Sequence, residues 1–145
     1  MRMRMLLAAA MLMAATTPAM AIDTCSGGNR AARKVTCVVD GDTIWQRGVK
    51  MRLLDIDAPE TSGAQCDRER AIGKQATHRL QQLMASGYRI IDDGKKDRTS
   101  DRRSLVRVIL PDGRDAGKVL IHEGLAQHWP NVGNRWCDGR QGNGS

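Results

Sequence analysis

The chain has 145 residues, a formal charge of +7 and 41% hydrophobic residues. This length indicates one domain rather than several. The apolar run near the N-terminus is too short for an ordinary membrane span, and there is no second apolar run. A basic balance favours polyanionic partners, chiefly nucleic acid, although solubility alone would also explain it.

Residues 1–21 have the pattern of a secretory signal peptide. Arg2 and Arg4 form a basic start, a short apolar run follows, and Ala-Met-Ala provides a cleavage site. The alternative is an uncleaved anchor. Cleavage would remove two arginines and no acids, so the charge would fall from +7 to +5. We expect residues 22–145 to form a single, monomeric domain with a flexible C-terminal end. It would be secreted or periplasmic and have no stable membrane association.

Four cysteines lie beyond the signal segment, and an even number in a small exported chain predicts two disulfides. Of the three possible pairings we favour Cys25–Cys37, which would close a hairpin containing Gly-Gly, and Cys66–Cys137, which would tie the tail to the middle of the chain. The paired CxxC spacing of a zinc site is absent. Each bridge would add about 3–4 kcal/mol of stability under the chain-entropy model.

The stretch VTCVVDGDTIWQRGVKMRLLDIDAPET, residues 35–61, predicts short β-strands separated by turns. Asp40-Gly41 and Gly48 are turn signals, and Pro59 ends the last apolar run because it lacks a backbone donor. Trp45 could face the core or a groove, and the core is favoured because large aromatic residues bury easily in small barrels. The predicted strands cover residues 35–39, 43–46 and 49–54.

Acidic side chains gather at the ends of these strands, together with one arginine: Asp40, Asp42, Asp57, Glu60 and Arg52. Neighbouring carboxylates are costly unless a positive charge joins them. A hard cation held by Asp42 and Asp57, or the guanidinium of Arg52, could supply that charge. DGDT alone is most often only a turn, but the combination suits metal-assisted phosphodiester cleavage.

The second half of the chain alternates helices and strands. The apolar spacing predicts a helix over residues 67–86. The charged stretch DGKKDRTSDRR, residues 93–103, is expected to be a loop that delivers an arginine to phosphate. Strands are predicted at residues 88–92 and 104–110, and a short helix at 115–123.

DGDT followed by MRLLDIDAPET, and then DRRSLVRVILPDGRDAGKVLIHEGLA, resembles the staphylococcal nuclease (thermonuclease) family over about residues 35–129. The resemblance implies an α+β fold, mainly a β barrel with helices, of the five-stranded OB-fold-like type. It also implies a Ca²⁺-dependent endonuclease that hydrolyses the phosphodiester bonds of DNA and RNA.

By matching motif, the resemblance makes Asp42 and Asp57 the side-chain ligands of Ca²⁺. Ala58 would add its backbone carbonyl, and Asp40 would lie close beside the ligands. Glu60 would be the general base.

The same resemblance makes Arg52 and Arg103 the two catalytic arginines. The family pattern D-x-Y-G-R departs here, because this chain has Asp101-Arg102-Arg103 without the Tyr-Gly pair. We expect Arg103 to be catalytic and Arg102 to assist substrate binding. Trp129 is expected at the rim of the site, where it could stack on a base.

Two other functions fit parts of the pattern. One is a non-catalytic OB-fold module that binds nucleic acid, and the other is an exported protein with a structural Ca²⁺. The acids and arginines of the site are all present, which favours the enzyme over both.

Overall fold

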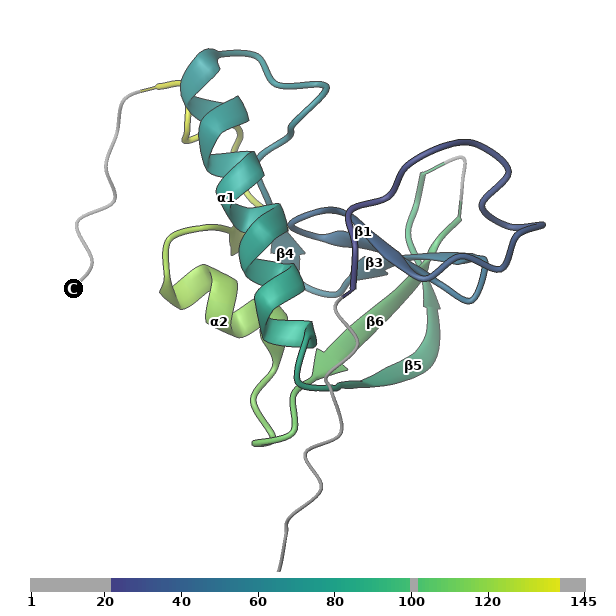
Figure 1. Cartoon of the computed structure of the whole chain (residues 1–145). Coiled ribbons are helices and arrows are strands. Elements are labelled where there is room, and N and C mark those ends of the chain that lie inside the picture. The colour runs from purple at the N-terminus through teal and green to yellow at the C-terminus, as the bar shows by residue number, and fades with distance from the viewer. Residues whose placement is uncertain (1–21, 100–101, 139–145) are drawn as a thin grey trace, which may run out of the picture.

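The computed structural model describes residues 22–99 and 102–138. Two helices lie beside a twisted sheet, and a separate two-stranded ladder lies where the helices meet the sheet (Figure 1). The elements, in chain order, are β1 (Cys37–Asp40), β2 (Thr43–Gln46), β3 (Val49–Leu53), β4 (Ile56–Asp57), α1 (Asp67–Met84), β5 (Arg89–Lys96), β6 (Ser104–Ile109), α2 (Ala116–His122) and β7 (Gln127–His128).

The main sheet has five strands in the order β1-β2-β3-β6-β5. Neighbouring strands are antiparallel except for β3 and β6, which are parallel. The short strands β4 and β7 pair separately. This is the α+β arrangement expected of an OB-like fold, with β1 and β5 at the two ends of the pairing order.

The core forms where the sheet meets the two helices. In β6 the alternating residues Ser104, Val106 and Val108 are buried. On β2, Ile44 is fully buried, so its neighbour Trp45 points to the opposite face and is only half-buried. Trp45 is therefore only partly buried and lies outside the core cluster, so the prediction that it faces the core was wrong.

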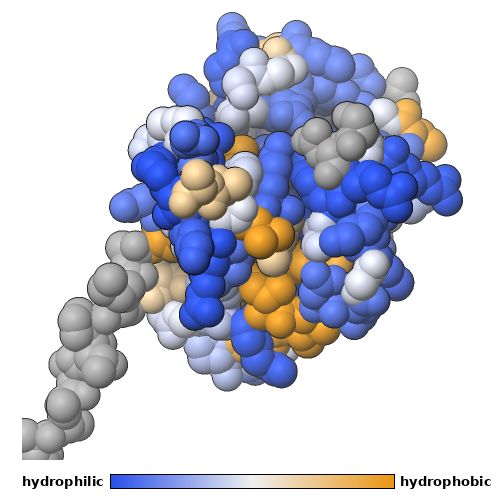
Figure 2. Space-filling model, turned by 90° about the vertical axis from the view of Figure 1, so that its right-hand side faces the viewer, coloured by the Kyte–Doolittle hydropathy of each residue, from blue (hydrophilic) through white to orange (hydrophobic). Residues whose placement is uncertain are grey.

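The predicted helices and strands lie close to their expected positions, with one clear difference. β5 continues to Lys96, so the first half of the predicted charged loop is a strand and the loop begins at Asp97. This half is exposed, and lysines are common on strands at the end of a sheet. The side of the molecule that carries β5 is largely hydrophilic, with an apolar patch (Figure 2).

Both predicted disulfides are present in the structure. Cys25 is joined to Cys37 and Cys66 to Cys137. The predicted signal peptide lies outside the described residues. Within the described part of the chain, no helix is long and apolar enough to span a bilayer.

Candidate active site

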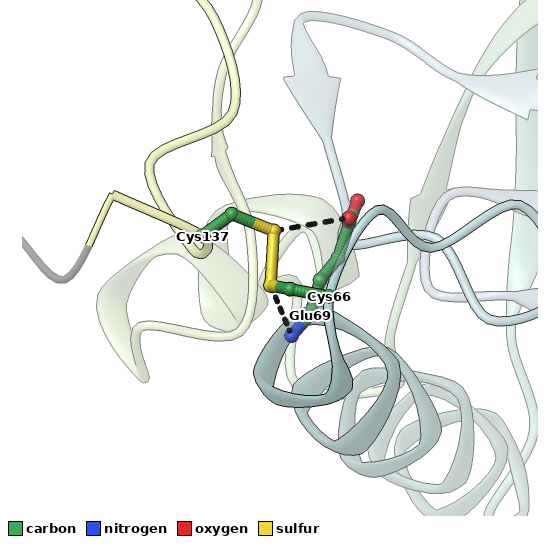
Figure 3. Close-up of side chains that lie close together, drawn as sticks. All are labelled: Cys66, Glu69 and Cys137. Atoms are coloured by element: carbon green, nitrogen blue, oxygen red, sulfur yellow. Dashed lines mark hydrogen bonds between the residues drawn. A yellow bond between two sulfur atoms is a disulfide. The ribbon is translucent and has the colours of Figure 1, made fainter.

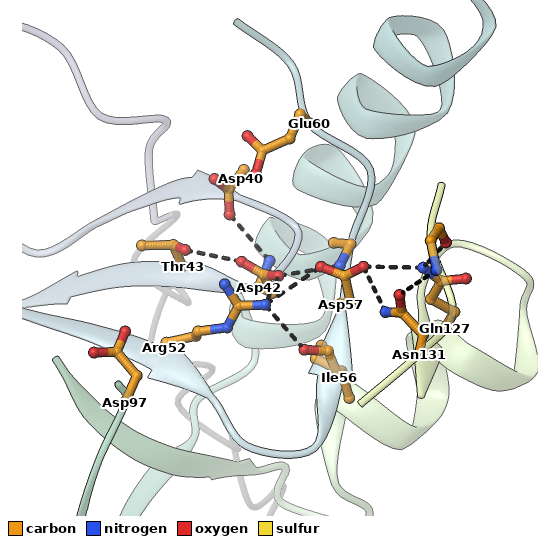
Figure 4. Close-up of polar contacts among 12 residues, drawn as sticks. Asp40, Asp42, Thr43, Arg52, Ile56, Asp57, Glu60, Asp97, Gln127 and Asn131 are labelled. Atoms are coloured by element: carbon orange, nitrogen blue, oxygen red, sulfur yellow. Dashed lines mark hydrogen bonds and ion pairs between the residues drawn. The ribbon is translucent and has the colours of Figure 1, made fainter. Parts of the chain in front are cut away.

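Arg52 lies between Asp42 and Asp57, the two aspartates predicted to be cation ligands. Its Nη2 is 3.2 Å from Asp42 Oδ2 and 3.3 Å from Asp57 Oδ1, and it also donates to the carbonyl of Ile56 at 3.4 Å (Figure 4). One guanidinium nitrogen on β3 therefore joins the turn between β1 and β2 to β4. Two carboxylates converge on a single point at the end of the sheet.

Asp42 is held by groups on both sides of its carboxylate. Oδ1 accepts from Thr43 Oγ1 at 2.9 Å, and Oδ2 accepts from Ala58 N at 3.0 Å. The second bond requires close approach of the DGDT turn to Ala58, which directly follows β4. Gly41 permits it, because a Cβ there would lie 2.7 Å from Ala76 Cβ and 2.8 Å from Ala58 Cβ. The glycine of DGDT is thus a packing requirement as well as a turn signal.

Asp57 is oriented by two amide side chains from the C-terminal part of the chain. Gln127 Nε2 donates to Oδ2 at 2.9 Å and Asn131 Nδ2 donates to the same oxygen at 2.8 Å. Gln127 Nε2 also donates to the carbonyl of Gly133 at 3.2 Å. These bonds occupy Oδ2 and leave Oδ1 turned toward Arg52 (Figure 4). The segment after β7 therefore fixes the direction of this carboxylate.

Asp40 and Glu60 face each other beside the Asp42 carboxylate (Figure 4). Burial, followed by the negative charges of Asp42 and Glu60, raises the pKa of Asp40 to about 7, although Asp42 N donates to it at 3.1 Å. Burial and the charges of Asp42, Asp57 and Glu69 likewise raise the pKa of Glu60. The cluster therefore has more negative charge than Arg52 balances, which is the setting in which a bound cation is favourable.

The Glu60 segment rests directly on α1. A Cβ at Gly73 would lie 2.7 Å from the carbonyl oxygen of Pro59 and 2.8 Å from that of Glu60. Only glycine allows the helix backbone to come this close. The position of Glu60 is therefore coupled to the packing of the helix.

Arg103 lies on the same face of the sheet as Arg52. Arg52 is aligned with Leu105 across the parallel pair, and side chains two residues apart share a face. Asp97 orients Arg103 by accepting from its Nε at 2.7 Å and from its backbone N at 3.0 Å. Burial raises the pKa of Asp97, but hydrogen bonds from Thr99 and Arg103 outweigh it and lower the pKa below its usual range.

Arg102 stands in a different position from its neighbour. Its φ is 44°, in the left-handed region, and its backbone N donates to Thr99 O at 3.0 Å. The residue is exposed and belongs to the turn before β6. Asp101, which matches the acid of the family pattern, lies outside the described residues.

Trp129 lies beside Arg52. Its ring centroid is 5.8 Å from the guanidinium carbon, within the range of a cation–π contact, and 53% of the residue is exposed. Its backbone N donates to Asp55 O at 3.0 Å, which holds the residue next to the turn between β3 and β4. An exposed ring beside the arginine is available to a ligand.

The donor set of the site fits a hard cation. Asp42 and Asp57 supply carboxylate oxygens, and the backbone of Ala58 lies next to Asp42. Within residues 22–99 and 102–138, the only place where three Cys, His, Asp or Glu ligand atoms converge is at Cys66, Glu69 and Cys137. The sulfurs there are joined in a disulfide, so that group offers no thiolates.

Sequence reasoning missed the polar residues that support the site: Asp97, Gln127, Asn131 and Glu69. Asp97 is one of several acids in a charged stretch, and the two amides are about seventy residues from their partner. Glu69 is an acid in the first turn of a helix, a position that usually needs no further explanation. None of them carries a local signal that separates it from ordinary surface residues.

Comparison with known proteins identifies the family of the chain. The chain is 28% identical over 127 residues to Protein ParB of Escherichia coli. This match covers 81% of this chain and 68% of that protein. It is 30% identical over 97 residues to an uncharacterized endonuclease of Escherichia coli O157:H7 and to one of Escherichia coli. These matches cover 64% of this chain and 58% of each endonuclease, so the chain spans little more than half the length of these relatives. The model of the staphylococcal nuclease homologue family matches residues 50–138, and the chain belongs to that family.

Proposed function

We propose that this chain is an exported, Ca²⁺-dependent endonuclease that hydrolyses the phosphodiester bonds of DNA and RNA. The observation that carries the proposal is Arg52, whose Nη2 lies within 3.3 Å of both Asp42 and Asp57. Asp42 lies before the range that the family model matches, so its place in the site rests on this geometry. Family membership and the two endonuclease relatives supply the reaction class.

Glu60 would act as the general base. It is an exposed carboxylate beside the cluster, and its raised pKa brings it closer to the operating pH, where proton transfer is most efficient. It would take a proton from the water that attacks phosphorus. Positioned bases of this kind contribute about 10²–10⁴-fold in rate.

Arg52 and Arg103 would bind the phosphate oxygens as negative charge develops on them. Arg52 is on β3, and Arg103 directly precedes β6, the strand that pairs with β3 in parallel. Asp97 engages the Nε of Arg103, so a phosphate would bind through the terminal nitrogens. Asp42, Asp57 and the Ala58 carbonyl would hold the Ca²⁺, which when bound neutralises charge on the phosphoryl group.

The protein would act as a monomer, and the surface around the site would guide the nucleic acid. Trp129 would stack on a base, Arg102 would contact a phosphate, and the five-stranded sheet would close into a barrel that serves as the binding surface, as in OB folds. Two disulfides support an oxidising compartment outside the cytosol.

Digestion of plasmid DNA and of single-stranded RNA, with and without excess chelator, tests the proposal. Glu60→Gln is expected to lower the turnover rate by about 10²–10⁴-fold. Glu123→Gln is the matched control, because it removes the same charge from a residue paired with Arg79 on the helices. Full cleavage in chelator would contradict the role of Ca²⁺. Binding without cleavage would instead favour the non-catalytic OB-fold module.

A further inference from the structure

A buried carboxylate on α1 holds both ends of the segment that follows Pro59. Glu69 is 4% exposed. Its Oε1 accepts from the backbone N of Glu60 at 3.2 Å, and its Oε2 accepts from the backbone N of Gln65 at 2.7 Å. One side chain therefore spans the segment from its first residue to its sixth.

The C-terminal tail closes this arrangement from the other side. Asn134 Nδ2 donates to Glu69 Oε2 at 2.7 Å, and its Oδ1 accepts from the backbone N of Trp136 at 3.0 Å. The Cys66–Cys137 bridge ties the tail to the start of α1, next to Glu69 (Figure 3). Glu69 N also donates to Cys66 Sγ at 3.4 Å, which caps the helix.

Hydrogen bonds stabilise the ionised form of the Glu69 carboxylate. Burial raises its pKa, but hydrogen bonds from Gln65 N, Asn134 and Glu60 N outweigh it and lower the pKa below the usual range. Both oxygens are occupied by donors, so Glu69 is poorly placed to take a proton from water itself. An ionised, fully bonded carboxylate at this position favours a holding role over a chemical one.

We propose that Glu69, supported by Asn134, is a positioning residue that fixes the backbone of Glu60 and so aims its carboxylate at the attacking water. The inference rests on the proposed function, in which Glu60 is the general base. Displacement of a catalytic group by about 1 Å can cost about 10²-fold in rate, so a hydrogen bond to the backbone of that group can matter for turnover.

Glu69→Gln is the main variant, because it keeps the size of the side chain but replaces one acceptor oxygen with a donor. We expect its kcat to fall by about 10- to 100-fold while KM changes much less. Asn134→Ala, which removes one donor to Glu69, should lower kcat less. It is the variant to measure if Glu69→Gln does not fold. Glu123→Gln serves again as the control for loss of a charge that is hydrogen bonded to another residue.

The decisive measurement is the double variant Glu60→Gln with Glu69→Gln. If Glu69 acts through Glu60, the second substitution adds little to the rate loss of the first. Rate losses that multiply, or a Glu69→Gln variant with a lowered melting temperature and normal kcat, would overturn the proposal.

Hydrogen exchange of the Glu60 and Gln65 amides provides a test without nuclease activity. Both amides should lose protection in Glu69→Gln and keep it in the control. Unchanged protection would overturn the holding role. If the wild-type chain cleaves no nucleic acid but the amides do lose protection, the proposed function fails while the contact made by Glu69 stands.

Discussion

Replacing Gly73 with alanine should displace Glu60, the proposed general base, while changing the stability of the fold only slightly. The new Cβ would lie 2.7 Å from Pro59 O and 2.8 Å from Glu60 O, whereas ordinary contact begins at 3.4 Å. The backbone of this segment must therefore move away from α1 by about 0.7 Å. A shift of this size at a catalytic group corresponds to a loss of about 10- to 100-fold in kcat.

The effect on stability should be small by comparison. Alanine is favoured over glycine in a helix by about 1 kcal/mol, which partly offsets an overpacking cost of about 1–3 kcal/mol. The net loss of about 0–2 kcal/mol corresponds to a fall of about 0–8 °C in melting temperature. Gly73→Ala should therefore remain folded at assay temperature with most of its activity lost.

The assay is the initial rate of plasmid cleavage over a range of substrate concentrations, beside a thermal melt of the same sample. Gly28→Ala is the matched control, since a Cβ there meets nothing within 4 Å. It should leave both measurements unchanged. A Gly73→Ala variant with a normal kcat would show either that Glu60 tolerates the shift or that it is not the base, and would refute the reasoning.

Three further outcomes are expected. Excess chelator should abolish cleavage and added Ca²⁺ should restore it with a dissociation constant of about 10⁻⁴–10⁻³ M, because few protein ligands are present; titration of activity measures this. Arg103→Ala should lower the single-turnover rate by orders of magnitude, Arg102→Ala should mainly weaken salt-sensitive binding, and Trp129→Ala should raise KM and spare the chemical step. A large rate loss in Arg102→Ala would contradict this assignment. The lowered pKa of Asp97 means that its stabilising effect is present above its ordinary pKa and is lost as pH falls through the folded value. Urea unfolding from about pH 5 downward should therefore show a shallower loss of stability in Asp97→Asn than in the wild type.

Local patterns were sufficient for most of the secondary structure. The apolar stripe of residues 67–86 predicted α1 to within two residues, and the turn signals separated the first three strands correctly. The positions of Trp45 and Lys96 could not be read in the same way. Trp45 follows the register of β2, and Lys96 belongs to a strand because its partner Ser104 begins β6.

The supporting residues of the site needed the tertiary structure. Between β5 and Arg103 the sequence offers two acids, Asp97 and Asp101, and only the β5–β6 pairing places Asp97 next to Arg103. Gln127 and Asn131 reach Asp57 because β7 pairs with β4. Residues defined by a motif could be nominated from the sequence, whereas residues defined by distant pairing could not.

The parallel pairing of β3 with β6 also bears on how the protein is made. It joins residues 51–53 to residues 104–106, and Asp57 receives its hydrogen bonds from residues 127 and 131. The chain must therefore be synthesised at least as far as residue 131 before these groups can meet. Truncated or half-synthesised chains are expected to be inert toward nucleic acid, which would spare the cell that produces the protein from damage by incomplete copies.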